Sequence, residues 1–255
     1  DDSLMEITHV IRGEDHVSNT PKQILIYNAL GFEVPTFAHL PMILGEDKKR
    51  LSKRHGATGV NEYESMGYQP DALLNYLVLL GWNPGTDEEI FDLDSLVKNF
   101  DIRKVQKKSA IYDQKKFNWI SSQHLMKEDS EKVLNRLASI DPKWGEYKSQ
   151  DYLVKVIDLI KPRSNSLSDL VDQSQYFFSS PKEFDSTQLQ KIWKQDTTET
   201  LIELKSILGA MNSWVATELD YNFKSFMDQR GLGFGKVMKP MRFLICGSLQ
   251  GPSLF

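Results

Sequence analysis

A strand, a helix and a second strand are predicted within the first 45 residues, and this order restricts the fold more than any other feature of the chain. Residues 7–12 are rich in β-branched side chains and predict the first strand. A helix is predicted over residues 21–30, because Thr20 is a favoured N-cap and a proline follows it at the first helical position. Residues 37–44 predict the second strand. Two strands joined through a helix lie parallel with a right-handed crossover, so we expect part of a parallel α/β sheet.

Five cations lie within residues 48–54, directly behind the second predicted strand. A run of Lys and Arg is usually a solvated surface or a nucleic-acid or targeting patch. A cationic loop at the end of a parallel strand is also a place to hold phosphates, because open α/β sheets bind ligands at the carboxyl ends of their strands. Ile43 and Leu44 would place backbone N–H and C=O groups at that end, although their apolar side chains also suit the core of a sheet.

Beyond Gly56 the pattern becomes helical, and strand signals are essentially absent after Glu128. The helices predicted before that residue cover 61–66, 70–80, 92–99 and 114–121. The helices predicted after it cover 129–140, 150–160, 166–178, 186–194, 198–211 and 213–229. Aromatic residues recur there near helical spacing, and we expect most of them to pack in a core. They include Tyr176, Phe177, Phe178, Trp193, Trp214, Tyr221, Phe223 and Phe226.

The composition excludes several classes of protein. With 255 residues, of which 40% are hydrophobic and 26% charged, the chain is long enough for two soluble domains and is not expected to be disordered. No apolar run approaches the roughly 20 residues of a membrane-spanning helix. The one cysteine, Cys246, excludes an internal disulfide framework and a multi-cysteine zinc site. We therefore expect a cytoplasmic protein in which Cys246 is a small core residue.

Any binding of nucleic acid must depend on local basic patches, because the formal net charge of the whole chain is −4. Residues 103–116 contain six cations and one anion. This segment is either a solvated surface or a contact for a phosphate backbone. The candidates for such a contact are Arg103, Lys104, Lys107 and Lys108.

Four short sequence strings occur in a specific order along the first half of the chain. They are I-T-H-V-I-R-G-E-D-H at 7–16 with S-N-T-P-K-Q at 18–23, F-A-H-L-P at 37–41, R-L-S-K-R at 50–54, and A-L-L-N-Y-L at 72–77 with L-G-W at 80–82. In this order, over residues 1–122, they resemble glutamyl-tRNA synthetases of the bacterial type, which are class I aminoacyl-tRNA synthetases. R-L-S-K-R resembles the K-M-S-K-S loop of that class. Beyond about residue 126 the resemblance is one of helical character and position.

The resemblance implies a fold in three parts. Residues 1–57 are expected to be the second half of a class I Rossmann catalytic domain with its K-M-S-K-S loop. Residues 58–125 would be an α-rich region that contacts the tRNA stem, and residues 126–255 an all-α anticodon-binding domain. Class I synthetases also carry an H-x-G-H signature upstream, and none of the five histidines begins that pattern. We therefore expect a C-terminal fragment, cut at both ends, that is inactive alone.

The resemblance also implies roles for particular residues. Lys53 is expected to be catalytic, because a lysine on a mobile loop can stabilise the charge that builds up on the phosphates of ATP. The residues expected to bind ATP are Lys53, Arg50, Ser52, Asp15, His16, Ile43 and Leu44, the last two through their backbone. Arg12 would bind the carboxylate of glutamate through its planar fork of donors. Arg54 joins the four basic residues of 103–108 as a candidate for tRNA binding.

The implied activity is that of a glutamate–tRNA ligase. Glutamate and ATP would give glutamyl-AMP, and the glutamyl group would then pass to the 3′-terminal adenosine of tRNA(Glu), with tRNA(Gln) left open as a second acceptor. Mg²⁺ would arrive with ATP and be held largely by its phosphates, and no protein-bound metal or zinc is expected. We expect a monomer that does not bind membranes.

Three alternatives remain at this point. A glutaminyl-tRNA synthetase would have β-barrels after its catalytic domain, and the helical second half argues against it. A short glutamyl-queuosine relative would lack an anticodon-binding half altogether. A non-catalytic tRNA-binding module built from a synthetase remnant would lack H-x-G-H in its natural gene, so the upstream sequence distinguishes it.

Overall fold

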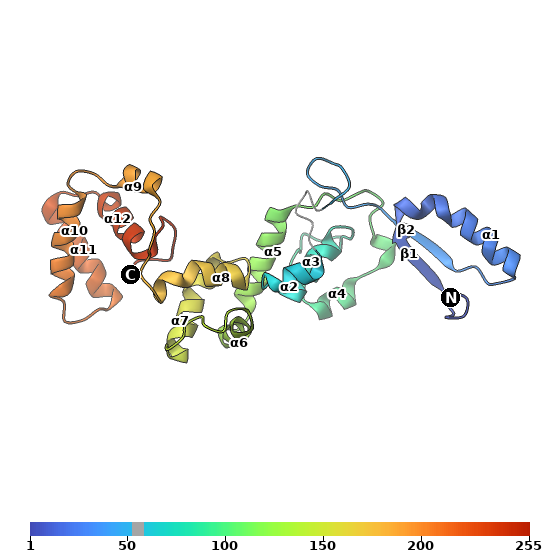
Figure 1. The fold of residues 1–255 in the computed structure, drawn as a ribbon, viewed down its shortest axis with the longest axis horizontal. Coiled ribbons are helices and arrows are strands. Elements are labelled where there is room, and N and C mark those ends of the chain that lie inside the picture. Colours follow the sequence, from blue (N-terminus) through green and yellow to red (C-terminus); the bar gives the residue numbers. More distant parts are fainter. Residues whose placement is uncertain (53–58) are drawn as a thin grey trace. The chain divides into compact units, whose positions relative to one another are not determined.

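The computed structural model describes residues 1–52 and 59–255, and the chain in it divides into two compact units, residues 1–128 and 129–255 (Figure 1). Each unit has its own hydrophobic core. Among the described residues, no helix has the length and apolar character needed to cross a membrane.

The first unit begins with the predicted strand, helix and strand. Strand β1 is His9–Gly13, helix α1 is Thr20–Leu30 and strand β2 is Thr36–Leu40. The strands pair in parallel, with a register that runs from His9 opposite Thr36 to Gly13 opposite Leu40. The parallel crossover is therefore confirmed. Strand β2 ends four residues earlier than predicted, because Pro41 follows it and has no N–H to donate to the ladder.

The start of α1 differs from the prediction. A 3₁₀ turn, Glu14–Asn19, runs directly into the helix, so the N-cap is Asn19, whose backbone is already helical (φ −85°, ψ −28°) and whose side chain makes no capping bond. Thr20 is therefore the first residue of the helix, and its hydroxyl bonds other side chains. The predicted end is confirmed, since Gly31 adopts the left-handed conformation (φ 68°) that glycine tolerates best.

Helices α2 (Val60–Ser65), α3 (Pro70–Leu79), α4 (Leu93–Asn99) and α5 (Gln114–Lys127) complete the first unit. Helix α5 continues past the predicted end at residue 121, and the Asp113 side chain caps its start by accepting from two backbone N–H groups. The core is largely aromatic and consists of Tyr63, Leu73, Tyr76, Tyr112, Phe117 and Ile120. Burial raises the pKa of Tyr76 to about 12, so its hydroxyl stays protonated and donates to the Asp113 carbonyl at 2.9 Å.

The second unit is helical throughout its described residues. Its helices are α6 (Ser130–Ile140), α7 (Gln150–Ile160), α8 (Leu167–Ser174), α9 (Ser186–Ile192), α10 (Thr197–Gly209), α11 (Ala216–Arg230) and α12 (Phe234–Cys246). The six predicted helices are present, with α8 ending before a 3₁₀ turn at Gln175–Phe177. Helix α12 was not predicted. A proline inside a segment argues against a helix when only the sequence is known. In the structure Pro240 lies within the helix and is buried.

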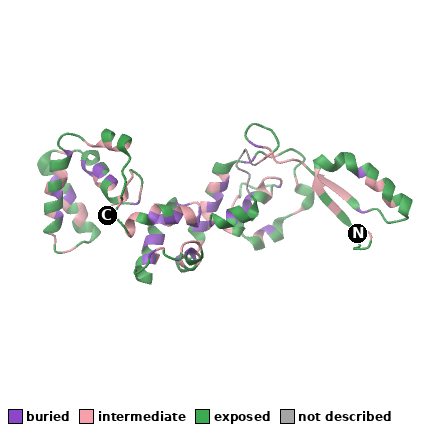
Figure 2. Cartoon of the chain, in the orientation of Figure 1, coloured by how far each residue is buried: buried purple, intermediate pink, exposed green. Residues whose placement is uncertain are grey.

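Buried and exposed residues alternate along the helices of the second unit (Figure 2). Burial of its aromatic residues only partly follows the prediction. Phe223 and Phe226 lie in the core with 2% and 5% of their surface exposed. Trp214 and Tyr221, in contrast, are 66% and 71% exposed and are not part of a core. Helical spacing alone does not distinguish the two pairs, because all four residues lie in one aromatic-rich stretch. Cys246 is half-buried and not the fully buried core residue that was expected.

Candidate active site at the ends of the two strands

Arg12, near the end of β1, is held by side chains from α1 and β2. Its Nη2 donates to Thr20 Oγ1 at 2.7 Å and to Gln23 Oε1 at 2.6 Å. Its Nε lies 3.5 Å from His39 Nε2. The guanidinium carbon is 5.3 Å from the centre of the Phe37 ring, a cation–π distance. The parallel pairing of the strands brings these residues together, since Arg12 lies opposite His39 in the register.

Asp15 and Arg50 form an ion pair that joins the turn after β1 to the cationic segment. Arg50 Nη1 lies 3.4 Å from Asp15 Oδ2, with the Asp15 side chain 37% exposed. Gly13 leaves the space that this arrangement needs, because a Cβ at position 13 would lie 2.6 Å from Asp15 Oδ1. His16 is exposed on the same turn, and its ring Nδ1 lies 3.4 Å from Asn19 Nδ2. Two of the predicted ATP-binding residues, Asp15 and Arg50, are therefore in contact.

The base of the cationic loop, formed by residues 43–44 and 50–51, is anchored to the helical part of the unit. Leu44 pairs antiparallel with Arg50 and parallel with Ile111. Its N–H donates to the Ala110 carbonyl at 2.8 Å, and its own carbonyl accepts from the Tyr112 N–H at 2.8 Å. The Ile43 and Leu51 side chains pack against the aromatic core of the unit. The base of the loop is therefore tied to that core by backbone and side chains together.

These bonds affect which backbone groups are available to a nucleotide. Both backbone groups of Leu44 are engaged in pairing with the 110–112 segment, and the Ile43 carbonyl accepts from the Leu51 N–H at 2.9 Å. The Ile43 N–H has no hydrogen-bond partner among the described residues. Ser52, which follows Leu51, is half-buried. The predictions for Lys53 and Arg54 concern positions outside the described residues.

The basic segment of the first unit separates into paired and unpaired cations. Arg103 donates to both carboxylate oxygens of Asp101, at 2.9 Å for the closest pair, and these bonds lower the pKa of Asp101. Lys104 Nζ donates to the Pro84 carbonyl at 3.2 Å. Lys107 and Lys108 are exposed and have no hydrogen-bond or ion-pair partner within the described parts of the chain. Together with Lys115, whose side chain is likewise exposed and unpaired among the described residues, they are the cations most available to a phosphate.

Sequence reasoning did not single out Thr20, Gln23 or His39 as site residues. All three lie within the strings that carried the resemblance, and that position was the available signal. His124, in contrast, is structural: its Nε2 lies 2.9 Å from Asn75 Oδ1, and burial lowers its pKa. Within residues 1–52 and 59–255 no group of three or more His, Cys, Asp or Glu side chains is arranged to hold a metal ion.

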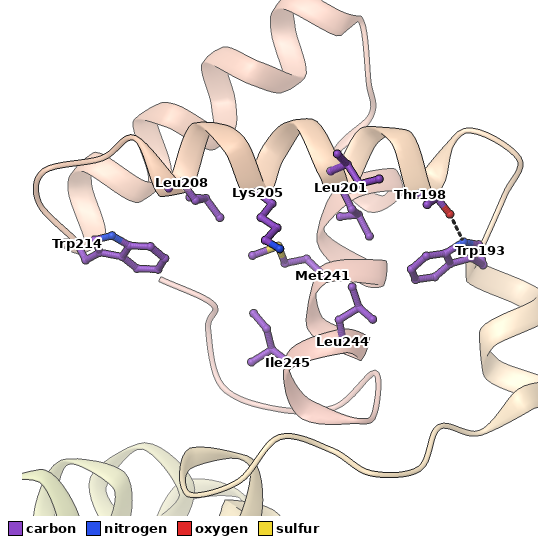
Figure 3. Close-up of a pocket in the computed structure, with 11 residues that line it drawn as sticks. Trp193, Thr198, Leu201, Lys205, Leu208, Trp214, Met241, Leu244 and Ile245 are labelled. Carbon is purple, nitrogen blue, oxygen red and sulfur yellow. Dashed lines mark hydrogen bonds between the residues drawn. The ribbon is translucent and has the colours of Figure 1, made fainter.

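The second unit has an apolar groove of about 540 Å³ between α10 and α12 (Figure 3). Trp193 and Trp214 lie at its two ends, and Leu201, Met241 and Ile245 line the space between them. The Trp193 ring is fixed by a 3.0 Å hydrogen bond from its Nε1 to Thr198 Oγ1. Lys205 is the one titratable side chain among the described residues that line the groove.

Comparisons with known proteins cover the whole chain. A family model described as "tRNA synthetases class I (E and Q), catalytic domain" matches residues 1–119, and one described as "Anticodon binding domain" matches residues 130–255. The glutamate–tRNA ligases of Moorella thermoacetica and Syntrophobacter fumaroxidans are 38% and 40% identical over 100% of this chain. This chain belongs to the glutamyl-tRNA synthetase family. It spans about half the length of these curated relatives, 54% of each.

Solved glutamyl-tRNA synthetase structures agree with this assignment. A glutamate tRNA ligase from Elizabethkingia meningosepticum, in complex with its amino acid, matches all of this chain and 54% of its own, with a TM-score of 0.80 and 32% identity. The synthetase from Elizabethkingia anophelis matches with a TM-score of 0.77 and 31% identity. The fold is therefore part of a class I catalytic domain followed by a helical domain, as predicted.

Proposed function

We propose that the chain supplies the C-terminal part of a glutamate–tRNA ligase. The observation that carries the proposal is the ion pair between Asp15 and Arg50, which ties the cationic segment to the turn that follows Arg12. This turn lies at the carboxyl end of two parallel strands, the place where open α/β sheets bind their ligands. Arg12 and Asp15 come from one string of the sequence and Arg50 from another, and the ion pair joins the two strings in the fold. The matches to glutamate–tRNA ligases over the whole chain support the same activity.

The proposed reaction has two steps. A carboxylate oxygen of glutamate attacks the α-phosphorus of ATP, the bond to the β-phosphate oxygen breaks, and pyrophosphate leaves. A ribose hydroxyl of the terminal adenosine of tRNA(Glu) then attacks the carbonyl of glutamyl-AMP, and AMP leaves. Both steps build negative charge on oxygen atoms, so the contribution of the protein is chiefly positioning and electrostatic stabilisation.

We assign the residues of the chain to parts of this reaction. Arg12 binds a carboxylate of glutamate. Lys53 stabilises charge on the phosphates in the transition state, with Arg50 and Ser52 beside it in the sequence. Asp15 and His16 lie on the turn that faces ATP and the terminal adenosine. Main-chain contact with adenine falls to the backbone of Ile43 and Leu44, where the Ile43 N–H has no partner among the described residues and the Leu44 carbonyl oxygen keeps a second lone pair. Mg²⁺ enters with ATP and is held by its phosphates.

Different parts of the chain would then contact different regions of the tRNA. We propose residues 1–57 for the catalytic half-domain, residues 58–125 for contact with the stem and residues 126–255 for the anticodon. The proposed enzyme is a cytoplasmic monomer that charges tRNA(Glu). Whether tRNA(Gln) is a second substrate is decided by aminoacylation of both tRNAs with the complete ligase.

The proposal requires an upstream segment, because the chain holds only part of the ATP site. We expect the 255-residue chain to catalyse no ATP–pyrophosphate exchange with glutamate, whereas the complete ligase, assayed with tRNA(Glu), catalyses both exchange and charging. Exchange by the chain alone at the rate of the complete ligase would contradict the division of the site. A natural gene without an upstream H-x-G-H would instead favour a non-catalytic tRNA-binding module.

The unpaired cations of the basic segment give a separate test of tRNA contact. Replacing Lys107 and Lys108 together with alanine should weaken tRNA binding and reduce the slope of log Kd against log salt by about one to two, because each phosphate contact releases counterions. The matched control replaces Arg103 and Lys104, whose side chains already bond Asp101 and the Pro84 carbonyl. We expect a smaller change there. An unchanged slope in the Lys107 and Lys108 variant would mean that this segment is a solvated surface and does not contact tRNA.

A further inference from the structure

The Arg12 guanidinium is held along one edge, and this leaves a defined part of it for a ligand. An arginine side chain carries five N–H donors. Two of them, on Nη2, are directed at Thr20 Oγ1 and Gln23 Oε1, and the Nε–H faces His39 Nε2. The remaining two donors, on Nη1, have no partner among the described residues. The side chain can therefore offer Nη1 to a carboxylate without breaking any bond of this arrangement.

The bonds around His39 define how the cluster is arranged. Thr20 Oγ1 accepts from Arg12 and lies 2.9 Å from His39 Nε2 and 3.3 Å from the His16 carbonyl oxygen. If His39 Nε2 carried a proton, that proton would face the Nε–H of a charged arginine. The Thr20 hydroxyl has one proton to donate, either to His39 Nε2 or to the His16 carbonyl oxygen, while its oxygen accepts from Arg12. Thr20 is thereby shared between the histidine and the arginine.

We propose that Thr20, Gln23 and His39 are positioning residues that fix Arg12, so that its Nη1 faces the carboxylate of glutamate. The inference rests on the proposed function, in which Arg12 binds glutamate. A guanidinium that is already held in place loses less conformational freedom when it binds, and this preorganisation strengthens binding. The phenyl ring of Phe37, against which the guanidinium carbon lies, limits its movement further.

The proposal predicts a selective effect on glutamate. In the complete ligase, Thr20→Val removes the shared hydroxyl and keeps the β-branched shape at a position that is 9% exposed. We expect the KM for glutamate in ATP–pyrophosphate exchange to rise about tenfold, the size expected for losing a hydrogen bond to a charged group. The kcat and the KM for ATP should change by less than about twofold, because the lost bond does not touch the phosphates. Thr20→Ser restores the hydroxyl and should restore the KM for glutamate.

Gln23 provides a second variant that does not depend on a buried position. Gln23→Met keeps the length of the side chain and removes the acceptor, so the KM for glutamate should rise as in Thr20→Val. Gln23→Glu places a carboxylate against Arg12 Nη2, which competes with the substrate for the same cation, and it should raise the KM for glutamate further. Lys22→Ala, at the exposed neighbour on α1, is the matched control and should leave both KM values unchanged.

The outcomes separate this inference from the function on which it rests. If Arg12→Ala raises the KM for glutamate while Gln23→Met and Thr20→Val do not, Arg12 binds glutamate and the positioning role is wrong. If Arg12→Ala itself leaves the KM for glutamate unchanged, the assignment of Arg12 fails first. If Thr20→Val unfolds the ligase by circular dichroism, the Gln23 pair decides alone. A failure of Thr20→Ser to restore the KM would also overturn the proposal, because the hydroxyl would then not be the group that matters.

Discussion

Replacing Lys53 with alanine in the complete ligase should slow the formation of glutamyl-AMP by roughly two orders of magnitude or more, the largest effect expected of any single change in this chain. Attack on the α-phosphorus builds charge on the phosphoryl oxygens and on the departing pyrophosphate. A cation that meets this charge mainly in the transition state raises kcat, and its loss costs about a hundredfold to a thousandfold. Single-turnover formation of glutamyl-AMP, with tRNA(Glu) bound, measures the step directly.

A control within the same cationic segment separates this role from general attraction of ATP. Lys49→Ala removes one positive charge four positions earlier in the sequence, at an exposed residue. It should raise the KM for ATP at most a few-fold and leave the single-turnover rate nearly unchanged, since long-range attraction between exposed charges is weak and screened by salt. Equal losses in both variants, or an effect of Lys53→Ala confined to KM, would contradict the catalytic assignment.

Much of the fold follows from local signals in the sequence. The β-branched run before Gly13 and the proline and glycine that bound α1 were enough to predict a parallel crossover, because only backbone propensities and chain direction enter that argument. Helix α12 shows the limit of such signals. Its interior proline argues against a helix locally, and the helix forms because tertiary packing of residues such as Val237 and Phe243, both fully buried, outweighs that preference.

The candidate site was less predictable than the fold, because its geometry depends on contacts between distant residues. Arg12 could be selected from its place at a strand end, whereas its partners Gln23 and His39 lie 11 and 27 positions away and meet it only once the register of the strands is known. The pairing of Leu44 with Ile111 could not be predicted from the sequence either. It joins segments that are far apart in the sequence and engages the N–H and carbonyl of Leu44, while the Ile43 N–H has no partner among the described residues.

The second large effect concerns the aromatic core under the loop. Phe117 is fully buried, and its ring centre lies 5.3 Å from that of Tyr63, 4.7 Å from that of Tyr68 and 5.2 Å from that of Tyr76. Phe117→Ala should lower the free energy of unfolding of the first unit by about 3–5 kcal/mol, since it removes buried surface and leaves a cavity. Hydrogen exchange of the full chain, read at the amides of α3 and α5, measures the change.

The matched control for this prediction is Phe243→Ala, which removes an equally buried phenylalanine from α12 in the second unit. It should speed exchange in the second unit and leave α3 and α5 unchanged, because each unit has its own core. Faster exchange in α3 and α5 with Phe243→Ala would mean that the two units do not unfold independently.

The same measurement tests whether the core supports the base of the loop. Ile43 and Leu51 pack on this core, and the Leu44 and Leu51 N–H groups are bonded to the carbonyls of Ala110 and Ile43. If the core holds the base of the loop in place, Phe117→Ala should also speed exchange at the Leu44 and Leu51 amides. If exchange is faster in α3 and α5 but unchanged at the Leu44 and Leu51 amides, backbone pairing alone holds the base of the loop. A loosened base would in turn disturb Arg50, which pairs with Leu44, and so reach the proposed ATP site from the core.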